Sequence, residues 1–492
     1  MRFKKITALA LAALMLLASA VACAEKNPAG PADSSDTSAV VVPDSSKSDE
    51  TTENVDENGY LRDDLPVLNY GGSDFVIFTW SNQTVWEWSE DENTTGDVIK
   101  DSIVKRQVNT EDRMGIKIVI ESMNGDWDHR NEFATAVDAS VQSGANDAYD
   151  LIGQYTPAAA IGAMKGCYED LSQIEHLDLK KPWWPDDIYT SSSINGKVYS
   201  VAGDISPTLI RNMVCILTNL KLANDLKMPD FYELVDNHQW TADVFMTYAT
   251  GTVTGLNADG SACYTTTITS NVCYDNVFYG GGFRFVERST EDGLVLSDDL
   301  SSTKLADWFD LWSGFWKKED VVALGVNAAN GFTTGNVLFH FGQVSDVQNY
   351  LQEIDFDFGI LPYPMYDEDQ ENYATICGYW VSLYSIPVNA NDKAKSGAVL
   401  ECLGSYGYRI ITPAVYEVSF TYRYLNSPEN AKIFNLLHDT LVFEPGRTFA
   451  DQINCFAAFR QAAGVSSSWS VYFKSNGPLW KKNIQKVVST LG

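Results

Sequence analysis

The sequence predicts an α/β protein built of two lobes. Strand-like and helix-like segments alternate from about residue 70 to the end of the chain, an order that calls for parallel sheets with helices on their faces. The segment beyond residue 58 runs to residue 492, which is longer than a single hydrophobic core usually extends. The first three of these segments already form a β-α-β unit, described next.

The opening unit begins with residues 75–80 (FVIFTW), whose apolar run predicts a short buried strand. Residues 96–114 carry apolar side chains at close to helical spacing, and Gly115 follows in the position where a glycine commonly ends a helix. Residues 116–120 (IKIVI) predict the second strand. Two strands joined through a helix indicate a parallel pair.

The same logic continues through the chain. In the first half we expect strands at residues 149–152, 197–201 and 213–218, and helices at residues 132–142, 158–165 and 220–226, with Thr241 capping a further helix. Residues 250–270 are rich in Gly, Asn and Thr and predict a hairpin and loops. In the second half we expect strands at 337–341, 356–361 and 380–386, and helices at 305–317, 344–350, 392–403, 431–437 and 478–491.

Two groups of tryptophans favour structural roles. Trp308, Trp312 and Trp316 recur every fourth residue of a predicted helix, which favours packing in the core over ligand binding. Trp183 and Trp184 lie between two prolines, and this setting favours the anchor of a surface loop.

The N-terminus decides the compartment. Arg2, Lys4 and Lys5 precede an apolar stretch at residues 6–22, a pattern typical of a signal peptide at residues 1–22. A transmembrane anchor is the alternative, but the stretch is near the lower length limit for one. Cys23 follows small residues and resembles the cysteine of a bacterial lipobox, whose thiol receives a diacylglycerol. Ala20 stands where that signal usually has leucine, so ordinary cleavage with an incidental Cys23 is the other reading.

Residues 24–58 predict a disordered tether behind the lipidated cysteine. The segment is rich in Ser, Thr, Asp, Glu, Pro and Ala and has almost no large apolar residue, so it cannot bury enough surface to offset the entropy of ordering. A flexible stalk allows an anchored domain to reach a partner at the membrane. Residues 59–492 contain no second apolar run long enough to span a bilayer.

Charge and motifs exclude several classes of protein. The net charge of −30 opposes binding to nucleic acids and polyanions. No G-x-S-x-G, H-E-x-x-H or P-loop motif is present, and the histidines are scattered, so we expect no catalytic residue, no metal and no cofactor. The cysteines form no C-x-x-C pair; Cys263 and Cys273 could form a disulfide, while small buried thiols are the favoured reading for most of the cysteines.

A family resemblance rests on segments spread over nearly all of the chain beyond the tether. In chain order they are FVIFTW (75–80) with the helix and IKIVI strand that follow, INGKVYSVAGD (194–204), NLKL (219–222), HQWT (238–241), FYGGGF (278–283), TGNVLF (334–339), FGILPYP (358–364), GYW (378–380) and IPVN (386–389). Together they resemble the maltose-binding-protein-like group of extracellular solute-binding proteins, bacterial family 1. The strand after Gly335 ends in HFGQ (340–343), without the aromatic residue that family members often place there.

The resemblance implies a fold, a function and partners. The fold is the two-lobed periplasmic-binding-protein-like fold of type II with a hinge, in which the chain crosses between lobes near Gly203, 354–359 and 410–412. Lobe 1 would comprise 59–203 with 360–411, and lobe 2 would comprise 204–359 with 412–492. The function is that of a monomeric, lipid-anchored extracellular protein of an ABC importer, which binds a carbohydrate, favoured as an oligosaccharide, between lobes that close on it. The partners are the ligand, the permease subunits and the membrane.

Candidate ligand-binding residues follow from this fold, because ligand lies in the cleft near loops that follow the strands. A sugar stacks its C–H faces on aromatic rings and needs directed hydrogen bonds for its hydroxyls. The candidates are Trp80, Asn82, Trp86, Asp126, Trp127, Gln154, Tyr155, Asp204, Tyr279, Gly280, Gln343, Tyr379 and Trp380.

Two rival functions stay open at this point. A secreted glycoside hydrolase also has many carboxylates and tryptophans, but nothing singles out the pair of carboxylates it requires. A surface glycan-binding or sensor protein would use the same fold without transport.

Overall fold

The computed structural model describes residues 54–492 except 90–95, 145–148, 191–192, 254–263, 269, 290–292, 319–320, 324–327, 352–353, 421–427 and 466. The predicted signal peptide, Cys23 and tether residues 24–53 lie outside the described residues. The last five residues of the predicted tether, 54–58, are ordered: Val55 pairs with Leu61, and the Arg62 amide donates to the Asn54 carbonyl at 2.8 Å. The tether therefore ends earlier than the composition suggested. The compact unit spans Thr51–Gly492.

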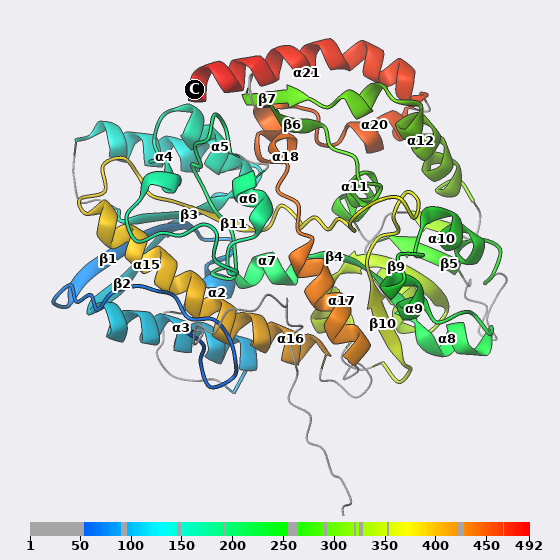
Figure 1. Cartoon of the computed structure of the whole chain (residues 1–492), viewed down its shortest axis with the longest axis horizontal. Coiled ribbons are helices and arrows are strands. Elements are labelled where there is room, and N and C mark those ends of the chain that lie inside the picture. The colour runs from blue at the N-terminus through cyan, green and yellow to red at the C-terminus, as the bar shows by residue number, and fades with distance from the viewer. Residues whose placement is uncertain are drawn as a thin grey trace, which may run out of the picture. The chain divides into compact units, whose positions relative to one another are not determined.

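The first of the two large sheets has four strands in the order β11-β3-β1-β2 (Figure 1). Its strands are β1 (Ser73–Trp80), β2 (Ile116–Met123), β3 (Leu151–Tyr155) and β11 (Ser382–Ser385). β1 runs parallel to both β2 and β3, and β11 is antiparallel to β3. The predicted β-α-β unit is confirmed. The carboxyl ends of three parallel strands meet at one edge of this sheet.

Helices cover both faces of the first sheet, with the pair α3–α15 on one face and the pair α4–α5 on the other (Figure 1). Asp97 caps α3 through hydrogen bonds to two backbone amides, and Gly115 ends it with a φ of 60°, in the left-handed region that glycine adopts without strain. The helices associated with this sheet are α2 (Thr84–Glu87), α3 (Val98–Met114), α4 (Arg130–Gln142), α5 (Thr156–Met164), α6 (Asp186–Thr190) and α15 (Lys393–Tyr406).

The second sheet has five strands in the order β10-β4-β9-β5-β8. Its strands are β4 (Val214–Asn219), β5 (Tyr264–Ile268), β8 (Val321–Ala323), β9 (Val337–Gln343) and β10 (Phe358–Leu361). β5 is parallel to β8 and β9, whereas β4 is antiparallel to β9 and β10. The helices around it are α7 (Pro207–Arg211), α8 (Leu220–Asp225), α9 (Phe231–Asp236), α10 (Ala242–Ala249), α11 (Asn271–Gly280), α12 (Thr303–Phe315), α13 (Ala328–Thr333), α14 (Val344–Tyr350) and α17 (Pro428–Asp439).

The C-terminal segment, from the start of α18 at residue 445 to residue 492, contacts both halves of the compact unit. The long helix α21 packs against α5 of the first half and against α12 and the hairpin strand β7 (Figure 1). The remaining elements are the hairpin β6 (Val286–Ser289) and β7 (Gly293–Leu296), the 3-10 turns Leu171–Gln173 and Asp298–Ser301, and the helices α16 (Thr412–Phe420), α18 (Pro445–Thr448), α19 (Ala450–Ile453), α20 (Ala458–Gly464) and α21 (Trp469–Leu491).

The chain passes between the two sheets at three places. Val201 still bridges to β11 of the first sheet, and β4 of the second sheet begins at Val214. The return lies between β10 and β11, so Ile360 and Leu361, predicted in lobe 1, belong to the second sheet. The third passage is the π-helical segment Gly407–Ile411, which joins α15 to α16 in one continuous helical run.

Four local predictions were wrong. Residues 197–201 make only isolated bridges, because Ile194 and Lys197 pair across a tight turn. The stretch 250–270 contains a central parallel strand, β5, where a hairpin was expected; residues 254–263 lie outside the described part of the chain. FYGGGF, the segment that resembles the family's glycine-rich turn, begins inside helix α11, which ends at Gly280, and only Gly281 and Gly282 form a turn. Helix α21 starts at Trp469 and holds Pro478 in its interior.

The tryptophan helix packs as predicted. Trp308 and Trp312 are buried, and the ring of Trp312 lies 6.1 Å from that of Phe341 on β9. Trp183 and Trp184 are buried as well, so they are core residues and not anchors at a surface.

Several cysteines of the described residues carry free thiols. Free thiols include the buried Cys167, Cys215, Cys402 and Cys455 and the half-buried Cys377. Cys263 lies outside the described residues, so its pairing with Cys273 stays a prediction.

Within the described ranges, no helix combines the length and the apolar character needed to cross a bilayer.

Candidate solute-binding site

Six aromatic side chains form one connected arc, which we name the aromatic cluster. The ring centroids of Trp127 and Phe456 are 6.4 Å apart, those of Phe456 and Tyr379 5.4 Å, and those of Tyr379 and Tyr155 6.4 Å. The arc continues from Tyr155 to Trp80 at 5.0 Å and ends at Trp380, 5.8 Å beyond. Its two ends reach solvent, since Trp127 is 40% and Trp380 is 48% exposed. These are the two exposed tryptophans of the described residues.

The elements of the fold explain why these rings meet. Trp80 and Tyr155 are the last residues of the parallel strands β1 and β3, and Trp127 follows β2 by four residues. Tyr379 and Trp380 lie in the passage from β10 to β11, and Phe456 lies between α19 and α20. Carboxyl ends of parallel strands share one edge of a sheet, which is where ligands bind in open α/β folds. The cluster therefore lies at the position where a ligand site is expected.

Hydrogen bonds fix the rings in place. The Trp80 indole Nε1 donates to Ser382 Oγ at 2.8 Å, which orients the ring under Trp380. The Asn212 amide donates to the Trp380 carbonyl at 2.9 Å, and the Gly378 amide donates to the Asn212 carbonyl at 2.9 Å. Asn212 stands at the entry to β4, so this exchange ties the wall of the site to the second sheet.

An ion pair lies at the Trp127 end of the cluster. Arg130 donates to the Asp451 carboxylate at 2.6 and 3.1 Å, and its guanidinium lies over the Trp127 ring, 4.1 Å from the centroid. The hydrogen bond and charge of Asp451 raise the pKa of Arg130. This contact joins the start of α4 to α19 of the C-terminal segment.

A second arginine stacks on the cluster from inside the protein. The Arg447 guanidinium lies 4.4 Å from the centroid of the Tyr379 ring, and Nη2 donates to the Cys377 carbonyl at 3.0 Å. Arg447 is 6% exposed. Stacking between a guanidinium and an aromatic face is attractive and becomes stronger where water is excluded.

The loops after β1 and β2 hold each other. The Gly125 amide donates to the Asn82 side chain at 3.0 Å, and Asn82 donates to Asp126 at 3.2 Å. Asp126 also bonds the His129 imidazole at 2.7 Å, and this hydrogen bond lowers the pKa of Asp126 and raises that of His129. Asn82 and Asp126 therefore shape the rim beside Trp127, as half-buried residues near the cluster.

Trp86 and Gln343 lie near this region but make no ring contact with the cluster among the described residues. Trp86, on α2, carries the Arg211 guanidinium over its ring at 3.9 Å. Gln343 ends β9, caps α14 and donates to the Asn212 carbonyl at 3.1 Å.

Four predicted site residues are buried and already engaged. Gln154 donates to Ser385 at 3.1 Å and accepts from the Tyr168 hydroxyl at 2.7 Å, because its side chain points to the face of the sheet opposite Tyr155. Asp204 pairs with His438 at 2.7 Å. The Tyr279 hydroxyl donates to Glu444 at 3.1 Å from within α11. At Gly280 a Cβ would lie 2.9 Å from Tyr363, which identifies a packing glycine.

The sequence interpretation missed Arg130, Arg447, Asp451 and Phe456. Three of them belong to the C-terminal segment, which carries no recognisable motif. Their one signal was indirect: Arg130 directly follows the polar loop after β2, at the start of a predicted helix.

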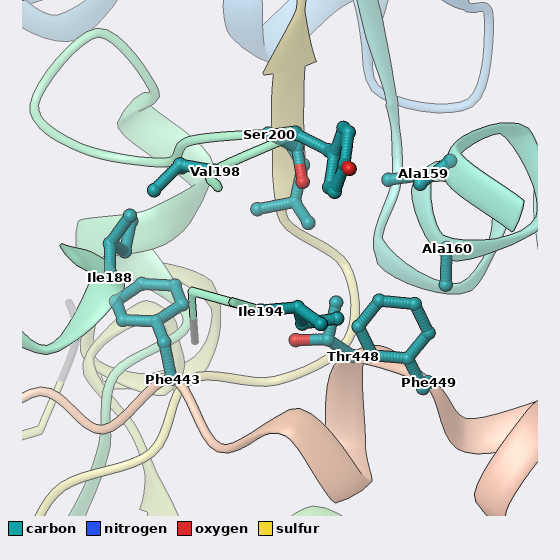
Figure 2. A pocket seen from close by; sticks show the side chains of 12 residues that line it. Ala159, Ala160, Ile188, Ile194, Val198, Ser200, Phe443, Thr448 and Phe449 are labelled. Atoms are coloured by element: carbon teal, nitrogen blue, oxygen red, sulfur yellow. The ribbon is translucent and has the colours of Figure 1, made fainter. Parts of the chain in front are cut away.

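A small cavity lies between α5, the turn before residue 198, β11 and the segment 443–449 (Figure 2). The side chains that line it are mainly apolar, including Ala159, Ala160, Ile194, Val198 and Phe449. A sugar needs directed hydrogen bonds, and this lining offers few. We interpret the cavity as a packing defect.

A metal site or a catalytic pair of carboxylates would be another kind of site among the described residues. No group of three His, Cys, Asp or Glu side chains there could hold a metal ion. At the Trp127 end of the cluster, Asp126 pairs with His129 and Asp451 pairs with Arg130.

Two α/β sheets with three passages between them, and an aromatic cluster with exposed ends beside the carboxyl ends of the strands, are typical of a binding protein of the two-lobed type. The chain belongs to the bacterial extracellular solute-binding protein family, whose model matches residues 109–405, more than half of the chain. This confirms the resemblance noted in the sequence. No curated protein sequence matches significantly.

Solved structures show the same fold at low sequence identity. A cyclo/maltodextrin-binding protein complexed with maltotetraose aligns with a TM-score of 0.54 and 14% identity, over 84% of this chain and 97% of that one. The ABC substrate-binding protein Lmo0181 from Listeria monocytogenes, in complex with cycloalternan, aligns at 0.51 and 13%, over 84% and 99%. UgpB from Mycobacterium tuberculosis, in complex with glycerophosphocholine, aligns at 0.51 and 14%, over 85% and 99%. The predicted type II periplasmic-binding-protein-like fold is confirmed.

Proposed function

We propose that this protein is the substrate-binding lipoprotein of an ABC importer and that its solute is a carbohydrate, favoured as an oligosaccharide. The observation that carries the proposal is the aromatic cluster. The six rings form a connected arc in which Trp80 and Tyr155 are buried, while the exposed ends, Trp127 and Trp380, offer platforms for the C–H faces of sugar units. Similar structures bind maltotetraose and cycloalternan, but one binds glycerophosphocholine, so the fold alone does not select the solute.

The proposed mechanism is closure of two lobes around the solute. The lobes are the two sheets with their helices, with the boundaries expected above except that β10 extends lobe 2 to Leu361. The cluster takes rings from the first sheet, from a passage between the sheets and from the C-terminal segment. A solute that contacts both exposed ends of the arc favours one relative placement of these parts, and a ligand shifts an equilibrium by its differential affinity for the two states. Such a shift lets an importer distinguish loaded from empty protein.

Binding without turnover is part of this proposal. A glycoside hydrolase needs one carboxylic acid and one carboxylate facing the bond it cleaves. Asp126 and Asp451, at the Trp127 end of the cluster, are paired with His129 and Arg130, which suits them to hold loops in place.

The test is a thermal-shift and calorimetric screen of residues 51–492 against neutral and acidic oligosaccharides, with product analysis of every hit. A solute that binds the native state raises the melting temperature by mass action and is recovered intact. Hydrolysis of a hit would replace the proposal with an enzyme. Failure of all glycans to bind would remove the carbohydrate assignment and leave the family unchanged.

Anchoring is the second part of the proposal. Cys23 carries the lipid, and the segment from residue 24 to residue 50 forms the tether to the compact unit. Metabolic labelling with a fatty acid, comparing the full chain with Cys23→Ser, checks this. Label in the variant equal to that in the full chain would contradict lipidation at Cys23. Permease genes beside this gene would favour import over a sensor or an adhesin.

A further inference from the structure

Arg447 is a buried cation with unused hydrogen-bonding capacity beside the proposed solute site. It is 6% exposed, and its Nη1 atom has no hydrogen-bond partner among the residues that the structure describes. The same holds for the Tyr379 hydroxyl, which is buried while the rest of the side chain is partly exposed. The guanidinium lies over the Tyr379 ring at 4.4 Å. The contact between Arg447 and Tyr379 therefore holds two hydrogen-bond donors, one on each residue, that have no partner among the described residues.

Buried polar atoms are nearly always paired, because an unpaired one loses its bond to water without compensation. Burial raises the pKa of Tyr379 far above its ordinary value, so its hydroxyl keeps its proton and can donate. The guanidinium keeps its charge at any physiological pH. The groups that these two donors lack are acceptors, and an anionic acceptor would also match the charge.

The charge of Arg447 is only partly balanced. It forms no ion pair with a carboxylate in the described part of the chain. Asp275, the nearest carboxylate along α11, is taken by Arg460 at 3.0 Å. Glu444 accepts the Arg447 backbone amide at 3.1 Å, the Tyr279 hydroxyl and the Val286 amide, and burial raises its pKa to about 7. The chain carries a net charge of −30, so a buried arginine beside the proposed site, without a carboxylate partner among the described residues, needs an explanation.

We propose that Arg447 and Tyr379 form a carboxylate-binding subsite at the inner side of the aromatic cluster, so that the solute is an acidic oligosaccharide containing a uronate unit. The uronate ring stacks on the cluster, one carboxylate oxygen accepts from Arg447 Nη1, and the other accepts from the Tyr379 hydroxyl. A planar carboxylate offers two oxygens to two donors, whereas a phosphate or sulfate ester would leave further oxygens unmatched. This inference rests on the proposed carbohydrate function.

Access to the subsite requires the lobe motion proposed above. Both donor atoms are shielded from solvent in this structure. The Arg130–Asp451 pair joins α4 to α19, a few residues from Phe456 on one side and Arg447 on the other. Separation of this pair lets the C-terminal segment move off the first sheet and admits the carboxylate.

The experiment compares matched ligands. Uronate oligosaccharides of several linkages are each paired with their methyl ester, which keeps the sugar and removes the charge, and binding to residues 51–492 is measured by calorimetry. At least one acid should bind about 10- to 100-fold more tightly than its ester, because a hydrogen bond to a charged group contributes roughly that factor. Arg447→Gln should abolish the preference for the acid over its ester, and Tyr379→Phe, which keeps the ring, should reduce the preference.

A matched control is available on the far side of Tyr279. Arg284 lies 5.9 Å from the Tyr279 ring centroid and Arg447 lies 5.7 Å from it, but Arg284 makes no contact with Tyr379 among the described residues. Arg284→Gln removes the same charge and should leave the preference intact. Circular dichroism and melting curves identify a variant that fails to fold, and Tyr379→Phe then carries the test.

The outcomes separate this inference from the proposed function. If esters bind as tightly as acids, or if Arg447→Gln keeps the preference, the carboxylate subsite is wrong while sugar binding stands. If only neutral oligosaccharides bind, the same conclusion follows. If no glycan of either kind binds, both the inference and the carbohydrate assignment are refuted.

Discussion

Replacement of Trp380 by alanine should weaken solute binding without unfolding the protein. The ring forms the open end of the aromatic cluster and rests on Trp80, with 5.8 Å between centroids. Since Trp380 is 48% exposed, and a tryptophan buries about 150–250 Å² in all, roughly 100 Å² is available to a sugar face. Complete coverage at about 25 cal/mol per Å² amounts to about 2.5 kcal/mol, or about 70-fold in Kd.

The expected loss of affinity is therefore about 10- to 70-fold, since a sugar covers at least half of the available ring. Isothermal titration calorimetry with the best ligand of the screen measures it. The melting temperature without ligand should change little, because substitutions at exposed positions commonly alter stability by less than about 1 kcal/mol. Leu479→Ala on α21 is the control, since Leu479 is similarly exposed (52%) and lies outside the cluster.

Two results would refute the reasoning. An unchanged Kd for Trp380→Ala would show that no sugar stacks on this ring, and the arc could then not be the binding surface. An equal loss of affinity in Leu479→Ala would show that the effect is general and does not come from the cluster.

Three further predictions concern the buried charges and the passages between the sheets. Burial lowers the pKa of His438, but the charge and hydrogen bond of Asp204 outweigh it and raise the pKa to about 10. The stabilisation from this pair is complete below about pH 6.5 and is lost as the pH rises towards about 10. The free energy of unfolding in urea should therefore fall over that pH range in the wild type but not in His438→Gln. The same fall with pH in both proteins would contradict this. Burial raises the pKa of Glu401 to about 7, so ionisation of its carboxyl lowers the stability of the folded protein at higher pH. Glu401→Gln should therefore raise the melting temperature above about pH 7 but not near pH 4. An increase in melting temperature that does not depend on pH would argue against this explanation. A Cβ on Gly407 would lie 2.0 Å from the Asp204 carbonyl oxygen, so Gly407→Ala should lower the free energy of unfolding by about 3 kcal/mol, while Gly464→Ala, with open space around it, should not.

The fold could be predicted from the sequence because its strongest signals are local. The apolar runs of β1, β2 and β9 and the helical spacing of α3 each belong to one segment, and Gly115 marks the end of α3 without any tertiary information. The failures came where local chemistry is ambiguous. The strand β5 reads YTTTI within a polar stretch, and its burial between β8 and β9 decides its conformation.

The site was only half predictable. The rule that ligands lie near strand ends pointed to Trp80, Trp127 and Tyr155, and the GYW motif to Tyr379 and Trp380, and the structure places these five rings in one cluster; their contact with a solute stays a prediction. The rule could not separate Gln154 from Tyr155, since neighbouring residues of a strand point to opposite faces and the sequence does not show which face is closed. Phe456 and Arg447 reach the site through the packing of the C-terminal segment, which is a tertiary property.

The composition of the cluster links recognition to motion. Trp80 and Tyr155 belong to the first sheet, whereas Phe456 and Arg447 belong to the C-terminal segment, whose helix α21 packs on both halves of the compact unit. A solute held only by the first pair would bind equally well in any arrangement of the lobes and would shift nothing. A solute that reaches Arg447 as well gains its strongest contacts only when both parts enclose it. The proposed carboxylate subsite is therefore also the element that makes closure depend on the correct solute.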